Sequence, residues 1–272
     1  SVSEEVLVYI EESTSVLELQ RLIKTLLKHR ELSKQLSTYI QGLNKHIQNG
    51  FIYGKLSQVA TSTGRLSSSS PNLQNVSNNP IKKAFVSRWG AEGRLIEFDF
   101  KQLEVVVLAH LSKDPTLISD IVTGKDIHSE LYNEMYGRYP TKEERKPFKS
   151  LTFGLLYGAG ASTLSKTAKV SYGLAKDFIR TFNTRYPLVS QYHLALHEKA
   201  NVEGVHSKNP AIYTKTYIHT SETGRKYCFS EYENTFSTTK QYSFSPSELK
   251  NYPVQGLATG DIVPMMLGFI FR

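Results

Sequence analysis

Two groups of charged side chains in this 272-residue chain could do chemistry together. Asp99 ends an apolar run, and a carboxylate at the end of a strand can hold Mg²⁺. Arg145 and Lys149 have the spacing of neighbours on one helix face, where two cations can hold a polyphosphate. A metal site beside such a face is what phosphoryl transfer needs, because its transition state is stabilised mainly by positioning and charge.

Local patterns predict the elements that carry these residues. Residues 94–100 are expected to form a strand that ends at Asp99, and residues 102–111 the helix that follows it. The stretch 124–137 predicts a second helix with Asp126 near its N-cap, where a carboxylate is favourable.

The basic helix has two competing start signals. Thr141 and Glu144 form a capping box ahead of it. Pro147 falls between Arg145 and Lys149, and proline is tolerated in a first turn but not in an interior. The sequence therefore predicts a start near Pro147, which would loosen the geometry of the two cations.

Elsewhere the chain alternates helical and extended patterns. Leucines at helical spacing predict a helix over 13–41, and 50–60 reads as a short strand pair around Gly54. A hairpin turn is expected at 220–229 and a last helix from near Val254. A linker-like composition, rich in Ser, Asn, Gly and Pro, predicts a loop over 61–80.

The loop carries four donors that a plain linker would not need. They are Arg65, Asn72, Gln74 and Asn75. Guanidinium and amide groups suit the acceptors of a DNA minor groove and the sugar oxygens. The net charge of +8 also favours a polyanionic partner.

Composition narrows the setting. No apolar run reaches the length of a membrane span, so no membrane partner is expected. The single cysteine, Cys228, excludes an internal disulfide and fits a reducing compartment, for which we expect the bacterial cytoplasm; its expected role is packing.

Five motifs in a fixed order resemble the polymerase I type, or family A, DNA-directed DNA polymerases. They are TGRLSSSSPNLQN (63–75), DFKQLE (99–104), DIH (126–128), R-x-x-x-K-x-x-x-F-x-x-x-YG (145–158) and NYPVQG (251–256). Each is weak alone, whereas their order is specific. The resemblance runs from about residue 14 to the end.

The resemblance implies an α+β right-hand polymerase fold with an incomplete palm sheet, a mostly helical fingers subdomain and a residual thumb helix. The implied division is thumb over 1–48, palm over 49–111, fingers over 112–250, and a return to the palm over 251–272.

It also implies the chemistry: transfer of a nucleotide from a dNTP to a primer 3′-hydroxyl, aided by two Mg²⁺ ions. Asp99 matches the first metal-binding aspartate, with the main-chain carbonyl of Phe100 beside it. Lys149 and Tyr157 join Asp99 as catalytic positions.

The same likeness assigns binding roles. The nucleotide-binding residues are Gln102, Glu104, His128, Arg145, Lys149 and Phe153, and the DNA contacts are Arg65, Asn72, Gln74, Asn75, Tyr157, Asn251 and Gln255. Glu104 matches a sugar gate that rejects a 2′-hydroxyl and bonds Tyr157. Phe153 would stack on the new base pair.

Two departures matter. Val106 stands where the family usually has arginine. The family's second catalytic aspartate lies in a His-Asp-Glu turn, and no His-Asp pair occurs in this sequence; Asp261 matches a non-catalytic position. We therefore expect a partial chain, inactive alone. It is either a fragment of a longer polymerase or one part of a split polymerase, and in the second case another polypeptide supplies the missing aspartate and completes the palm. Bacteriophage genomes are where such a split gene is expected.

Two other classes remain open. One is a non-catalytic module that binds primer-template DNA. The other is a single-subunit RNA polymerase relative, against which Glu104 and the TGRLSS stretch argue.

Overall fold

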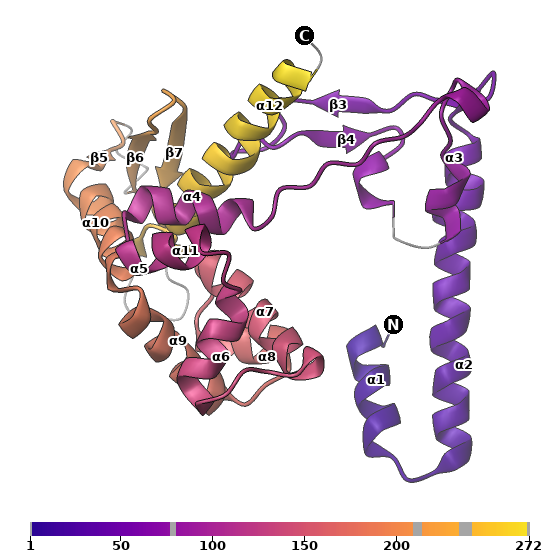
Figure 1. Cartoon of the computed structure of the whole chain (residues 1–272), viewed down its shortest axis with the longest axis horizontal. Coiled ribbons are helices and arrows are strands. Elements are labelled where there is room, and N and C mark those ends of the chain that lie inside the picture. The colour runs from indigo at the N-terminus through magenta and orange to yellow at the C-terminus, as the bar shows by residue number, and fades with distance from the viewer. Residues whose placement is uncertain (1, 77–79, 209–213, 234–240, 271–272) are drawn as a thin grey trace. The chain divides into compact units, whose positions relative to one another are not determined.

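The computed structural model describes residues 2–76, 80–208, 214–233 and 241–270. The chain forms two compact units, Ser1–Gln58 with Leu66–Phe98 and Val59–Arg65 with Asp99–Arg272. Figure 1 labels their elements. Parts of the predicted β-rich stretch over 205–245, and the last residues of the predicted final helix, lie outside the described residues.

The first unit is built on a helical hairpin, in which α1 packs beside α2 (Figure 1). Its elements are α1 (Glu4–Ser13), α2 (Leu17–Lys34), a π-helical segment (Gln35–Gln41), α3 (Gly42–Asn44), β1 (Ile47–Gln48), β2 (Phe51–Ile52), β3 (Lys55–Ser57), β4 (Ser67–Ser69) and 3-10 turns at Leu73–Asn75, Pro80–Ala84 and Gly90–Glu92. The helix predicted over 13–41 therefore begins later, because Thr14 and Val16 are extended.

The strands near Gly54 do not pair as the sequence predicts. β2 pairs with β1, and β3 pairs with β4, which lies within the stretch 61–80 that was predicted as a loop. The expected hairpin around Gly54 is therefore wrong, and two separate antiparallel pairs take its place. Register between segments apart in sequence is a non-local choice that the short run 50–60 does not encode.

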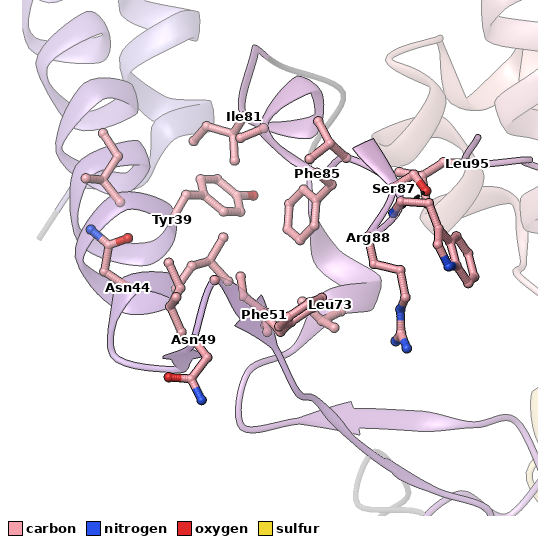
Figure 2. Close-up of a pocket in the computed structure, with 18 of the residues that line it drawn as sticks. Tyr39, Asn44, Asn49, Phe51, Leu73, Ile81, Phe85, Ser87, Arg88 and Leu95 are labelled. Carbon is pink, nitrogen blue, oxygen red and sulfur yellow. Dashed lines mark hydrogen bonds between the residues drawn. The ribbon is translucent and has the colours of Figure 1, made fainter. Parts of the chain in front are cut away.

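The first unit also contains a cavity of about 750 Å³. Figure 2 shows Tyr39, Ile81 and Phe85 around it, with Phe51 and Arg88 on another side. The guanidinium of Arg88 lies 5.7 Å from the ring centre of Phe51. The walls of the cavity are mainly apolar and aromatic, which is usual for a small-molecule pocket.

The second unit is mostly helical. Its elements are α4 (Leu103–Ser112), α5 (Pro115–Val122), α6 (Ile127–Tyr136), α7 (Lys142–Leu156), α8 (Ala161–Ala168), α9 (Tyr172–Arg185), α10 (Pro187–Glu203), β5 (Val205–His206), β6 (Lys215–Thr220), β7 (Lys226–Ser230), β8 (Tyr232–Glu233), β9 (Tyr242–Ser243), α11 (Pro246–Gln255), a π-helical segment (Gly256–Ile262) and α12 (Val263–Ile270). β5, β6 and β7 form an antiparallel sheet beside α10 (Figure 1).

Two hydrophobic cores hold this unit together. The larger is built by α4 to α9, and Leu108, Leu151 and Phe178 are fully buried in it. The smaller joins the sheet to α10 and α11 through Tyr217, Phe229 and neighbours. Cys228 points the other way and is exposed, so the packing role expected for it is wrong. None of the helices in the described residues has the length and apolar character to cross a membrane.

The strand predicted over 94–100 does not form. These residues have no regular secondary structure, and Leu95 and Ile96 are 66% and 73% exposed. A strand needs a partner for its backbone groups, and within the described residues no neighbouring strand pairs with this segment. The apolar run favours a strand on local grounds, but whether the strand forms depends on a partner that the run does not encode.

Two helices begin earlier than the sequence predicts. α7 starts at Lys142 under the Thr141–Glu144 capping box, so Pro147 lies inside it. The box and the burial of Phe148 stabilise the helix despite the proline. The last helical stretch begins at Pro246 rather than near Val254, with Ser245 as its side-chain cap.

Candidate active site

A short hydrogen bond joins the two helices that carry the predicted site. The Tyr157 hydroxyl, at the C-cap of α7, donates to Glu104 Oε2 at 2.5 Å, in the first turn of α4. Burial and then this bond raise the pKa of Tyr157 well above its ordinary value. The contact that the resemblance implies between these side chains is therefore present.

A second pair fixes the first cation of α7. Arg145 donates from Nε and Nη2 to the two carboxylate oxygens of Asp126, at 2.7 and 2.6 Å. Asp126 also caps α6 by accepting from Ser129 N. Burial opposes its ionisation, but the bonds from Arg145 and Ser129 outweigh burial and lower the pKa of Asp126 to about 2. Arg145 is thus already paired with a carboxylate before any phosphate binds.

His128 lies inside this cluster. It is 1% exposed, and its Nδ1 has no hydrogen-bond partner among the described residues. Burial lowers its pKa to about 4 despite the attraction of Asp126, and the charges of Arg145 and Lys149 lower it further. The imidazole is therefore neutral at pH 7. Its ring lies 5.5 Å from that of Phe153.

Lys149 supplies the exposed cation of the cluster. Its Nζ lies 5.9 Å from the ring centre of Phe153, within cation–π range. The described residues contain no carboxylate that pairs with it. Of the two cations on α7 that were predicted to hold phosphate, Arg145 is therefore paired with Asp126, and Lys149 is unpaired within the ranges that the structure describes.

The predicted metal-binding residues are exposed at the start of the unit. Asp99 is exposed, and in the described part of the chain its carboxylate has no hydrogen bond or ion pair. Phe100 is half-buried. Gln102 precedes α4 with φ 55° in the left-handed region, and its carbonyl accepts from Val105 N at 2.9 Å. No contact joins Asp99 to Glu104, Lys149 or Tyr157.

The donor set suits magnesium only in part. Across the described ranges, no three His, Cys, Asp or Glu side chains gather as a metal site. One free carboxylate and a carbonyl fit an Mg²⁺ ion that is otherwise held by water and substrate phosphates. They do not fit a two-ion site.

Besides Tyr157, three predicted DNA contacts belong to the same unit. Arg65 is exposed, and its charge opposes the burial that raises the pKa of Tyr157, so it lies near that hydroxyl. Asn251 keeps a buried Oδ1 that no described residue satisfies. Gln255 ends α11 and is half-buried.

The other three predicted contacts belong to the first unit and brace its loop. Gln74 accepts from Ser68 N and donates to Leu66 O, so its amide is engaged at both ends. Asn72 caps the turn Leu73–Asn75 with its side-chain oxygen. Asn75 is exposed.

Sequence reasoning missed two features of the site. Asp126 was interpreted as a cap, and nothing in its spacing from Arg145, 19 residues on, indicated a pair. Arg225 was not singled out, although it bonds Asp261 across 36 residues. The one sequence signal for the role of Asp126 was the Asp-Ile-His run, which places this carboxylate two residues before His128.

Comparison with solved structures defines the class of fold. All of this chain superimposes on 47% of the polymerase domain of Pol1 from M. smegmatis, solved with DNA primer-template and dNTP, at TM-score 0.71 and 24% identity. At that identity the likeness concerns the fold alone, which is the α+β polymerase fold.

The sequence defines the family. Residues 1–269 match the family model described as DNA polymerase family A. The chain belongs to DNA polymerase family A.

Curated relatives agree with that assignment. DNA polymerase I of Helicobacter pylori is 38% identical over 176 residues, which is 62% of this chain and 20% of the relative. The thermostable DNA polymerase I of Thermus filiformis is 35% identical over 250 residues, 87% of this chain and 28% of the relative. The chain thus spans about a fifth to a quarter of the length of the curated relatives it matches.

Proposed function

We propose that this chain binds a dNTP and primer-template DNA and forms the nucleotide-binding part of a DNA polymerase that extends a primer 3′-end. The observation that carries the proposal is the bond from Tyr157 to Glu104, with the cluster of Asp126, Arg145 and His128 on the same helix α7 and its neighbour α6. Thumb, palm and fingers boundaries at 1–48, 49–111, 112–250 and 251–272 belong to the same proposal.

The triphosphate would lie along α7. Lys149 provides the available charge, and Arg145 has donors left after its two bonds to Asp126, so it can bind one phosphate without changing rotamer. A neutral His128 with its proton on Nε2 would donate one further hydrogen bond, since Nδ1 has no acceptor. Phe153, beside both, would stack on the incoming base.

The sugar would lie against Glu104. A 2′-hydroxyl would collide with this carboxylate and compete for its bond with Tyr157. A buried polar pair left unsatisfied in this way gives strong rejection, on the order of 10⁴. DNA synthesis rather than RNA synthesis follows from that arrangement.

Magnesium would be held by Asp99 and the Phe100 carbonyl, together with substrate phosphates. The ion would supply Lewis-acid stabilisation of the transferring phosphoryl group. The second catalytic carboxylate, in a His-Asp-Glu turn, would come from a missing segment or from a second polypeptide. That partner, a phage source and a cytoplasmic location stay predictions that rest on the family resemblance.

A primer-extension experiment tests the proposal. The purified chain is mixed with labelled primer-template, Mg²⁺ and dNTPs, alone and with a polypeptide that carries the His-Asp-Glu turn. We expect binding of primer-template by the chain alone, extension only in the mixture, and loss of extension with Asp99→Asn. Extension by the chain alone refutes the need for a partner, and binding without extension in the mixture favours a non-catalytic module.

A further inference from the structure

Arg225 and Asp261 form an anchor between the β6–β7 hairpin and the π-helical segment Gly256–Ile262. Arg225 donates to Asp261 Oδ1 from Nε at 3.0 Å and from Nη2 at 2.6 Å. Thr223, at the hairpin tip, donates to the other carboxylate oxygen at 2.6 Å. The Asp261 side chain is only 12% exposed, and these donors satisfy both of its carboxylate oxygens.

The same guanidinium fills a gap in the helical hydrogen bonding. Pro264 has no N–H, so it cannot donate to the carbonyl of Gly260 four residues earlier. Arg225 Nη2 donates to that carbonyl at 3.0 Å. The anchor therefore stabilises a helical stretch that the proline would otherwise leave with an unpaired carbonyl.

The loop 61–65 packs directly on this anchor. A Cβ on Gly64 would lie 2.2 Å from Arg225 Nη1, and a Cβ on Gly260 would lie 2.6 Å from the carbonyl of Thr63. Gly64 also has φ +77°, which side chains disfavour. Glycine on both sides lets the backbone of the loop touch the anchor.

Arg65 closes the loop. Its carbonyl accepts from the hydroxyl of Thr61 at 2.8 Å, and Gly64 N donates to the carbonyl of Thr61 at 3.1 Å. These bonds use only the backbone of Gly64 and Arg65, and the Arg65 side chain is exposed. The loop thus fixes the backbone from which this cation extends.

We infer that Arg225 and Asp261 are positioning residues that hold the loop 61–65 and aim Arg65 at the primer end. Neither touches the nucleotide in this arrangement; each acts through Arg65. The inference rests on the proposed function for its consequence in DNA binding. Its structural half, the immobilisation of the loop by the anchor, stands apart from it.

Hydrogen exchange tests the structural half without DNA. In Arg225→Ala, the amide of Gly64 should exchange about tenfold faster or more, because its turn loses the surface it packs on. The control is Glu222→Ala, which removes a second tether of the same hairpin tip, the 2.8 Å bond to His110, away from the loop. Unchanged exchange in Arg225→Ala, or an equal change in the control, overturns the inference.

Primer-template affinity tests the functional half by a double-mutant cycle. Arg65→Ala should weaken binding about tenfold, the order expected for one lost arginine contact. Arg225→Ala should weaken it similarly, and the double variant should stay within about twofold of Arg65→Ala. Losses that multiply would show that Arg225 acts independently of Arg65 and would refute the positioning role.

Two further variants keep the test decisive if Arg225→Ala does not fold. Gly64→Ala should displace the loop from an intact anchor and reproduce the loss. Arg225→Lys retains a donor for Asp261 and should recover part of both protection and affinity. If the wild-type chain binds no primer-template, the proposed function fails, and the exchange experiment alone decides the anchoring.

Discussion

Glu104, the proposed sugar gate, accepts a hydrogen bond that links α4 to the C-cap of α7. In the completed polymerase, Glu104→Ala should raise the efficiency of ribonucleotide use relative to deoxyribonucleotide use by up to about 10⁴, since the side chain that meets the 2′-hydroxyl is gone. The measurement is the ratio of kcat/KM values for matched dNTP and rNTP.

Tyr157→Phe is the matched control for that change. It removes the hydrogen bond at Glu104 Oε2 but keeps the ring and the carboxylate. We expect it to relax selectivity less than Glu104→Ala does. An unchanged ratio in Glu104→Ala would dismiss the gate.

The lowered pKa of Asp126 predicts that the free energy of unfolding depends on pH. Its folded-state pKa, about 2, lies below the ordinary 3.8, so its contribution is complete above pH about 4 and is lost as pH falls through 2. Asp126→Asn should lower the free energy of unfolding at pH 7 by about 2 kcal/mol, and the difference from wild type should shrink between pH 4 and pH 2. Denaturant titrations over that range measure it.

The exposed pair of Asp177 and Arg180 offers the comparison, since these side chains lie 3.2 Å apart in water. Asp177→Asn should change the free energy of unfolding by less than about 0.5 kcal/mol. A difference for Asp126→Asn that stays constant down to pH 2 would contradict the assignment.

At the scale of single residues, the sequence predicted one contact of the candidate site but not the partners of its arginines. The motif order identified Glu104 and Tyr157 together, because the family resemblance carries that contact. The partner of Arg145 depends on how α6 packs on α7, and the partner of Arg225 on how a hairpin meets a helix. Such packing depends on how the hydrophobic cores assemble, and the spacing of residues along the sequence does not specify that.

Among the elements, a buried ionic cluster joins α5, α6 and α9. Asp120 is 2% exposed and accepts from Arg185 Nη2 at 2.8 Å and from the Tyr186 hydroxyl at 2.9 Å. Arg185 also reaches Glu130 and Glu134. Each of the three helices thus contributes a charge that the others satisfy.

Removing the central carboxylate should therefore destabilise the second unit. Asp120→Ala removes the most buried partner of Arg185 and the acceptor of the Tyr186 hydroxyl. It leaves Arg185 only Glu130 and Glu134 as carboxylate partners among the residues that the structure describes. We expect a loss of about 3 kcal/mol in the free energy of unfolding. Arg180→Ala on the same helix α9 removes only an exposed ion pair and should cost less than about 1 kcal/mol. Equal losses would argue against the cluster as the link between the helices.

The elements divide into those that local signals specify and those that need partners. The helices near 102–111 and 124–137, the Thr141 box and the hairpin at 220–229 were predicted, since periodicity, caps and turn residues act within a few positions. The strand over 94–100 and the pairing near Gly54 were not, because strand pairing is settled by distant segments. The start of α7 was wrongly predicted near Pro147, because the capping box stabilises a helical turn ahead of the proline.

Over the whole molecule, the excess of 33 Lys and Arg over 25 Asp and Glu predicts salt-sensitive binding to DNA. A protein that neutralises about four phosphates loses roughly 100-fold in affinity between 50 and 200 mM salt. Fluorescence anisotropy with labelled primer-template at several salt concentrations gives the slope. Lys28→Ala should leave the slope unchanged, since that cation is already paired with Glu31 at 2.9 Å. A flat dependence would refute phosphate-driven binding.

The π-helical segment also limits how the chain can vary. A side chain at Gly256 would meet the Tyr227 hydroxyl at 1.9 Å, much as one at Gly260 would strike the loop backbone. By contrast, Gly173 in α9 has open space, with its nearest neighbour atom at 4.0 Å. A saturation library should find Gly256 and Gly260 intolerant and Gly173 permissive, with alanine at 173 stabilising its helix by up to about 1 kcal/mol. Substitutions are therefore expected to be tolerated at Gly173 in α9 and to be excluded where the π-helical segment contacts the β6–β7 hairpin.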